Sequence, residues 1–166
     1  MHKAKIDDRY LGHVCTEVGM REDVTELIGA MLGACWERRA TDARPFRPDR
    51  QLAVGLAANQ VGSNLRLIVI DYAGFVGGMI NPVITKYRGG TTKAKEQCLS
   101  FGTKSAYVER HKIIKVKWLD KDWGEHTAQF RGLMARIIQH EVDHLDGIDM
   151  FERERLGVPT TGELKL

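Results

Sequence analysis

Residues 133–145 read Leu-Met-Ala-Arg-Ile-Ile-Gln-His-Glu-Val-Asp-His-Leu, with apolar side chains at the three-four spacing of an amphipathic helix. His140 and His144 lie four residues apart, so one face of such a helix can direct both imidazoles at a single ion. Glu141 follows the first histidine and suits a general base that acts on metal-bound water. A solvated helix with two histidines in chance register is the alternative, but the apolar flanks disfavour it. The segment therefore predicts a metal-dependent hydrolase.

A catalytic divalent ion usually takes three ligands from the protein, so a third ligand has to come from elsewhere. Downstream of the helix the candidates are Glu152, Glu154 and Glu163, and a ligand there would suit a metallopeptidase. Upstream, Cys98 lies between polar neighbours, and a thiolate is a strong ligand for zinc or ferrous iron. Most free cysteines are small core residues, however. On these residues alone both possibilities stay open.

Length and charge narrow the class of protein. The chain has 166 residues and a formal net charge of +3, which fits one domain over 1–166. No apolar run approaches the roughly eighteen residues of a membrane span, and three cysteines at unrelated spacings indicate thiols rather than disulfides. We expect a cytoplasmic protein without a membrane partner. The basic residues of 38–50 are too sparse to predict direct nucleic-acid binding.

Local patterns predict an α+β domain with strands in its middle and a helix near each end. The segment 41–50 contains two prolines and many charges, so we expect a solvated loop inserted within the domain. Gly89-Gly90 and the residues 122–124 are expected to be turns between antiparallel strands. The expected helices cover about 23–39 and 133–145, and the expected strands cover 65–72, 79–87, 108–119 and 126–130.

Three segments, taken together, resemble the peptide deformylase family. Residues 53–60 are similar to its motif Gly-x-Gly-Leu-Ala-Ala-x-Gln, and residues 96–100 to Glu-Gly-Cys-Leu-Ser. Residues 139–145 match Gln-His-Glu-x-Asp-His-Leu without a difference. The order and spacing also fit, from about Asp23 to Gly147. The resemblance implies an α+β fold in which antiparallel or mixed sheets pack around a central helix that carries the third motif.

The resemblance also implies a role for each matching residue. Glu141 would move a proton from water to the departing amine, while Gln60 and the backbone N–H of Leu99 would bind the formyl oxygen. One divalent ion is implied, Fe²⁺ in cells, with Zn²⁺, Ni²⁺ or Co²⁺ as possible substitutes. Its implied ligands are Cys98, His140 and His144.

The implied substrates are N-formyl-methionyl peptides or nascent chains, from which formate is released. Gly55 would let the substrate backbone approach closely, and an apolar pocket would receive the methionine. The residues expected to contact the substrate are Gly55, Val54, Gln97, Leu133 and Ile137.

The sequence departs from the family pattern in several places. Ala53 and Gln97 each replace a glycine of the family motifs. A long side chain at position 97 could narrow the cleft that receives the methionine side chain. A non-enzymatic binding module is therefore an alternative function. The insertion around 44–50 lengthens the segment before the first motif. The chain ends about twenty residues after His144, without the long C-terminal helix that many bacterial members associate with the ribosome, so weak or no stable ribosome docking is expected.

Overall fold

The computed structural model describes residues 4–41 and 54–159. Ala53, residues 42–50 of the insertion and the tail after Pro159 lie outside these ranges. The expectations for those segments, including weak ribosome docking, therefore stay predictions. None of the helices in the described ranges combines the length and the apolar character that crossing a membrane would require.

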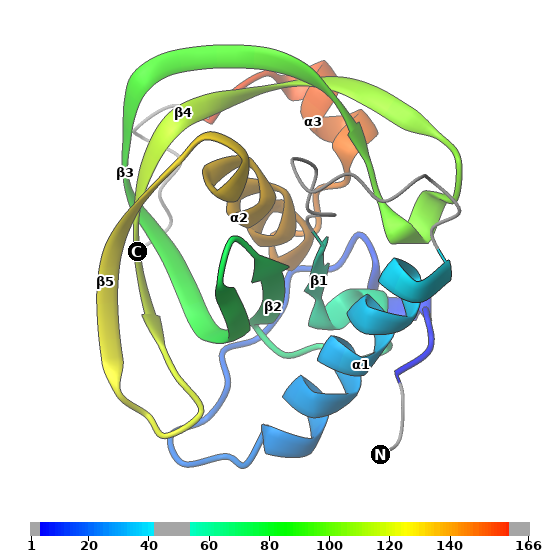
Figure 1. Ribbon diagram of the computed structural model, residues 1–166, viewed down its shortest axis with the longest axis vertical. Helices are drawn as coiled ribbons and strands as arrows, with labels where there is room; N and C mark the ends of the chain where they lie inside the picture. Colours follow the sequence, from blue (N-terminus) through cyan, green and yellow to red (C-terminus); the bar gives the residue numbers. More distant parts are fainter. Residues whose placement is uncertain (1–3, 42–53, 160–166) are drawn as a thin grey trace.

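The core of the fold is one antiparallel sheet with the strand order β1-β2-β3-β4-β5 (Figure 1). Each strand pairs with the next one along the chain, so short turns suffice to connect most of them. The sheet and its helices confirm the predicted α+β class. The strands are β1 Val54–Ala57, β2 Leu67–Tyr72, β3 Phe75–Gln97, β4 Ser105–Leu119 and β5 Glu125–Arg131.

Strand β3 is much longer than its sequence pattern predicts. The predicted turn at Gly89-Gly90 is wrong, because both glycines lie inside β3 with φ of 77° and 68°. The pairing of β3 with β4 shifts register between Arg88 and Thr91, so the two glycines form an irregularity that bends the strand. The predicted turn at 122–124 is confirmed, since the N–H of Trp123 donates to the carbonyl of Asp120 at 3.0 Å. The bend allows β3 and β4 to curve over the helix α2 (Figure 1).

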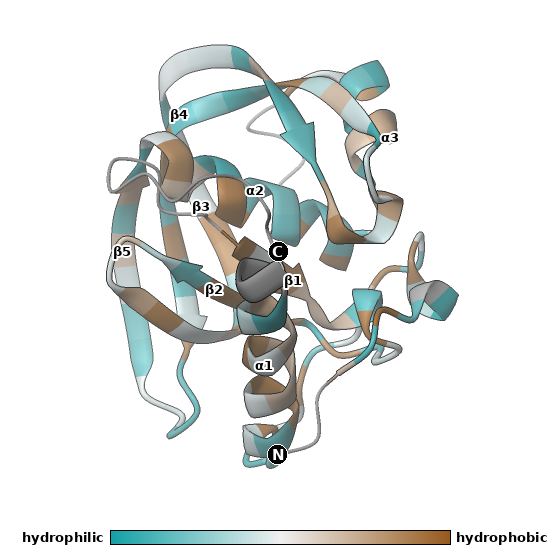
Figure 2. Cartoon of the chain, turned by 45° about the vertical axis from the view of Figure 1, so that its right-hand side comes forward, coloured by the Kyte–Doolittle hydropathy of each residue, from teal (hydrophilic) through white to brown (hydrophobic). Residues whose placement is uncertain are grey.

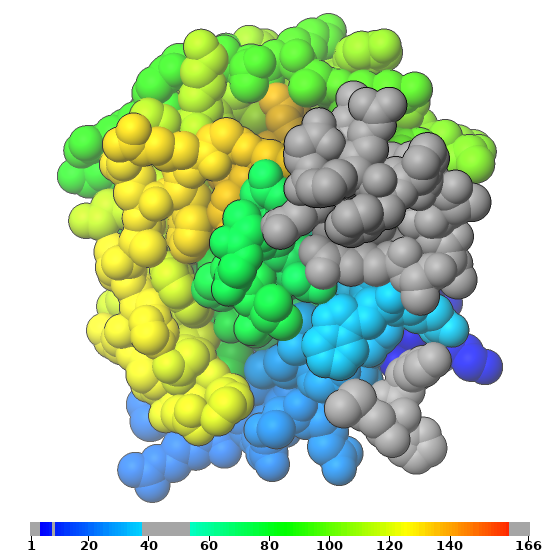
Figure 3. Space-filling model, viewed as in Figure 1, coloured from blue at the N-terminus to red at the C-terminus, as the bar shows by residue number. Residues whose placement is uncertain are grey.

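Helix α2, Gly132–Leu145, packs against one face of the sheet and carries the segment that predicted it. Its buried residues run without a break from Ile137 to Leu145. They join a core that includes Ile68 and Ile70 of β2. On the face drawn in Figure 3, the orange part of the chain, near residue 140, is visible only as a small area. The helix is therefore central, as expected.

Helix α1, Thr25–Thr41, lies against the other face, as the alternation along β2 requires. Leu67 and Val69 point into a second core that α1 covers, while Ile68 and Ile70 face α2. The predicted helix at 23–39 is confirmed to within two residues. Asp23 accepts a hydrogen bond from the N–H of Thr25 at 2.9 Å.

A third helix, α3 at Met150–Leu156, was not predicted, because seven residues are too few to show a clear helical period. Asp149 caps it by accepting hydrogen bonds from the N–H groups of Phe151 and Glu152, each at 2.8 Å. The helix contributes the buried Met150 to a small core with Cys98 and Val108. This packing brings α3 close to the end of β3.

Candidate metal centre

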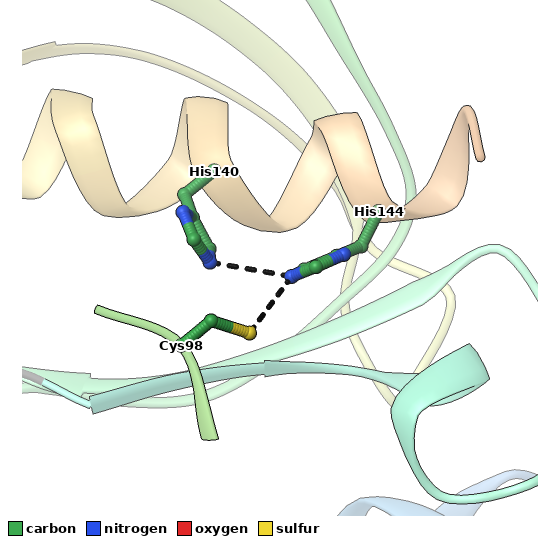
Figure 4. Close-up of side chains that lie close together, drawn as sticks. All are labelled: Cys98, His140 and His144. Atoms are coloured by element: carbon green, nitrogen blue, oxygen red, sulfur yellow. Dashed lines mark hydrogen bonds between the residues drawn. The ribbon is translucent and has the colours of Figure 1, made fainter. Parts of the chain in front are cut away.

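Three side chains converge where α2 faces the end of β3 (Figure 4). The Nε2 atom of His144 lies 3.2 Å from Cys98 Sγ and 3.2 Å from His140 Nε2. All three residues are buried, and their ligand atoms lie within 4.8 Å of one another. Tetrahedral coordination at usual zinc bond lengths separates such atoms by about 3.3–3.6 Å. One sulfur and two imidazole nitrogens at these separations fit a divalent transition metal.

The alternation of β3 directs Cys98 toward α2. Glu96 and Cys98 are buried, whereas Gln97 between them is exposed, so its side chain lies on the opposite face. Register with β4 holds as far as the pair Gln97 and Ser105. Gln97 therefore extends away from the metal-binding atoms.

Glu96 contacts the ring nitrogen of His140 that faces away from the cluster. The sequence motif alone did not indicate this role. The Oε2 atom of Glu96 lies 2.9 Å from Nδ1 of His140, on the ring side opposite the cluster. A carboxylate at this nitrogen fixes the tautomer and orientation of a metal-binding imidazole. Burial raises the pKa of Glu96, but hydrogen bonds from His140 and Arg110 outweigh burial and keep that pKa far below its usual value.

Buried ion pairs connect Glu96 to the rest of the site. Arg110 donates to both oxygens of Glu96, each at 3.0 Å, and also pairs with Asp143. Arg153 of α3 donates to both oxygens of Asp143, at 3.0 and 2.7 Å. Arg136 reaches Glu96 at 2.7 Å. These contacts join β3, β4, α2 and α3, and they fix the helix that carries both histidines.

His144 is in the protonation state that metal binding needs. Burial, together with the neighbouring His140, lowers the pKa of His144 well below its usual value. Its imidazole is therefore neutral, with a nitrogen lone pair available to an ion.

Glu141 lies in the same buried region with one oxygen unused. Among the described residues, its Oε2 atom has no hydrogen-bond partner. Burial raises the pKa of Glu141 to about 7. A carboxylate with this pKa and a free oxygen can accept and return a proton near neutral pH.

Gln60 ends the short 3-10 helix Ala58–Gln60, which directly follows β1. Its Oε1 accepts from the N–H of Ala57 at 2.8 Å, and its Nε2 donates to Cys98 Sγ at 3.2 Å and to Ser100 Oγ at 3.0 Å. The amide is thus fixed with its donor group toward the cluster. Leu99 follows Cys98 and is partly buried.

The residues expected to contact substrate are not gathered in one place. Ile137 is buried in the α2 core, and Leu133 at the start of the helix is 46% exposed. Val54 belongs to the core that α1 covers, on the other face of the sheet. Of this group, the structure brings Gly55 and Ile137 together beside Glu141.

Gly55 is required by packing inside the protein. A Cβ atom there would lie 2.6 Å from Glu141 Oε1 and 2.8 Å from Ile137 Cγ2. We predict that Gly55→Ala lowers the free energy of unfolding by about 1–3 kcal/mol, because the added methyl group displaces buried atoms. Urea denaturation measures the change.

Gly77→Ala is a matched control, since Gly77 lies in β3 and its Cβ would meet nothing within 4 Å. It should change stability by much less. Equal stability of the two variants would show that the close approach at Gly55 is easily relieved.

The downstream carboxylates do not approach the histidines. Glu152 pairs with Arg155, and Glu154 accepts from the N–H of Tyr107 at 3.1 Å. Glu163 lies outside the described residues. Within the described ranges, the one group of three or more candidate ligand side chains is that of Cys98 with the two histidines.

Comparisons with known proteins find similar sequences over part of the chain. A peptide deformylase of Cytophaga hutchinsonii is 42% identical over 103 residues, which cover 57% of this chain and 56% of that protein. Another, of Pelotomaculum thermopropionicum, is 43% identical over 102 residues, covering 61% of this chain and 65% of that protein. The matches thus span between half and two thirds of these relatives.

Solved structures match over a larger share of both chains. Peptide deformylase from Thermotoga maritima superimposes with a TM-score of 0.78 at 29% identity, covering 92% of this chain and 98% of that chain. The structure of the peptide deformylase from Vibrio parahaemolyticus bacteriophage VP16T, in complex with actinonin, superimposes with a TM-score of 0.75 at 34% identity. The match covers 90% of this chain and 99% of that chain. The family model for polypeptide deformylase matches residues 3–156. The chain therefore belongs to the polypeptide deformylase family.

Proposed function

We propose that residues 1–166 act as a single catalytic domain that removes the N-formyl group from formyl-methionine at the N-terminus of peptides and nascent proteins. Water is consumed, and formate and a free amine are the products. The observation that carries the proposal is the buried cluster of Cys98, His140 and His144, together with the buried Glu141, which follows His140 on α2 and has one oxygen without a hydrogen-bond partner among the described residues. Because formylated chains are made in the cytoplasm, we propose that the protein acts there.

In this mechanism Cys98, His140 and His144 would hold the metal ion, which when bound supplies a Lewis acid and lowers the pKa of a water ligand. Glu96 keeps His140 oriented through Nδ1. Glu141 accepts a proton from the attacking water and gives it to the nitrogen of the leaving amine, so one carboxylate serves as base and then as acid.

Charge develops on the formyl oxygen during the attack, and donors placed there in advance lower the barrier. Gln60 supplies an amide N–H that is already oriented by Ala57, and the backbone N–H of Leu99 supplies a second donor. The bond from Gln60 to Ser100 or to Cys98 would be exchanged for one to the substrate. For the ion we propose Fe²⁺ in cells, with Zn²⁺, Ni²⁺ and Co²⁺ also suited to one thiolate and two imidazoles.

Formate release tests the proposal directly. Protein purified without air should release formate from formyl-Met-Ala-Ser, lose this activity on chelation, and regain it when Fe²⁺ or Ni²⁺ is added. The product can be measured with a coupled formate dehydrogenase. Absence of metal-dependent formate release would refute the proposed function and favour a binding module.

A further inference from the structure

Positive charge is concentrated in one part of this chain. Residues 75–119 contain nine lysines and arginines and two acidic residues, whereas the net charge of the whole chain is only +3. This segment is β3, the following turn and β4. The upper part of the sheet that they form is mostly hydrophilic in the hydropathy view (Figure 2).

Strand register gathers three of these charges, and a fourth from β5, on the sheet face opposite α2. Lys86 of β3 lies directly across from Lys115 of β4. Arg88 lies across from Ile113, whose partner on the far side is Arg131 of β5. We call Lys86, Arg88, Lys115 and Arg131, all exposed, the basic face.

The charges of the basic face are not neutralised within the described part of the chain. No ion pair there joins an acidic side chain to any of the four residues, whereas nearby Lys117 pairs with Glu125 at 3.3 Å. Like charges directly opposite each other destabilise a sheet. Lysines often protect the edges of sheets, but Lys86 and Lys115 lie on the interior strands β3 and β4. Edge protection therefore does not explain them.

We infer that the basic face binds the phosphate backbone of RNA. Opposite side chains on paired strands stand about 4.5–5.5 Å apart, and alternate residues along a strand about 6.7 Å, so the four charges form a compact array. Arg88 and Arg131 can each contact a phosphate with two N–H groups. This inference departs from the sequence expectation, because a linear count cannot show which charges the strands bring together.

The neighbouring residues favour RNA over a membrane surface. Thr127 and Gln129 are exposed beside the basic face and can donate hydrogen bonds, whereas the Thr85 hydroxyl already donates to the carbonyl of Lys115 at 3.2 Å. Val83 is the single large apolar side chain exposed there among the described residues, at 40%. Membrane binding needs a larger apolar set. The choice of RNA also rests on the proposed function, since nascent chains emerge from an RNA-rich particle.

Binding at this face would leave the metal centre open, because the two lie on opposite sides of the sheet. Ile84 and Val116, the inward neighbours of Lys86 and Lys115, belong to the α2 core. RNA binding and formate release are therefore separate measurements, and either can fail without the other.

Fluorescence anisotropy with a labelled 20-nucleotide oligouridine tests the inference. For Lys86→Gln with Lys115→Gln, affinity at 0.1 M salt should fall about 20-fold and the salt slope should decrease by about 1.4, because each phosphate contact on a single strand contributes about 0.7. Formate release should not change. Removing the facing charges should also raise the midpoint of urea denaturation slightly.

Two control variants are available, one outside the basic face and one that keeps its charge. Lys104→Gln with Lys121→Gln removes the same charge outside the basic face and should leave affinity nearly unchanged, as should Lys86→Arg with Lys115→Arg. An equal loss in the Lys104 and Lys121 pair would overturn the inference. So would undetectable RNA binding, or binding of phosphatidylserine vesicles in place of RNA.

Discussion

Replacing Glu141 by glutamine is expected to slow formate release about 10²–10⁴-fold, the usual contribution of a general acid and base. The amide keeps the size of the side chain, which packs against Gly55, but cannot take a proton from water. Because Glu141 is not one of the three ligand side chains, we expect the variant to retain one metal ion per chain. Steady-state kinetics and metal analysis of the same sample give both values.

Glu26→Gln is a suitable control, since Glu26 is exposed on α1 and far along the chain from the site. It should keep full activity. Near-normal rates in Glu141→Gln would show that Glu141 does not transfer the proton. Loss of the metal along with the activity would show that the side chain acts by supporting the metal site.

Replacing Arg110 by methionine is expected to lower the free energy of unfolding by about 3–5 kcal/mol, because it leaves Glu96 and Asp143 as buried charges with fewer partners. Arg110 is only 1% exposed, and its guanidinium contacts both carboxylates. Total stabilities are usually about 5–15 kcal/mol, so this is a large fraction. Chemical denaturation measures it.

Lys112→Met, an exposed position on the same strand, should change stability by less than about 0.5 kcal/mol. Arg110→Lys, which keeps the charge without the bidentate contact, should fall between the two. A loss below about 1 kcal/mol in Arg110→Met would mean that water or rearranged side chains satisfy the two carboxylates.

The site residues that could be predicted from spacing alone are those that lie on one helix. His140 and His144 are neighbours on one helix whatever the rest of the fold does, so their spacing sufficed. Cys98 needed the resemblance to a known family, because a lone cysteine is more often a core residue. Glu96 lies 44 residues before His140, and the two meet because α2 packs against the end of β3. No local pattern records that contact.

The inward position of Arg110 can be inferred from the sequence pattern of β4. Ala106 and Val108 occupy inward positions of β4, and Arg110 continues their alternation. A charged residue at an inward position predicts a buried partner, although it does not say which one. In the fold as a whole, the periodic segments were predicted, while β1 and α3 were too short. The turn predicted at Gly89-Gly90 was wrong because two adjacent glycines are typical both of turns and of irregularities within strands.

The wide separation of the metal ligands along the chain has a consequence for folding equilibria. Cys98 and His140 meet only after β3 has paired and α2 has docked, so the unfolded chain offers no comparable three-ligand site. An ion that binds only the native state shifts the equilibrium toward it, by about 2.7 kcal/mol at one hundred times its dissociation constant. The supply of free metal would therefore set the fraction of chains that are folded, and the midpoint of thermal unfolding should rise as metal is added.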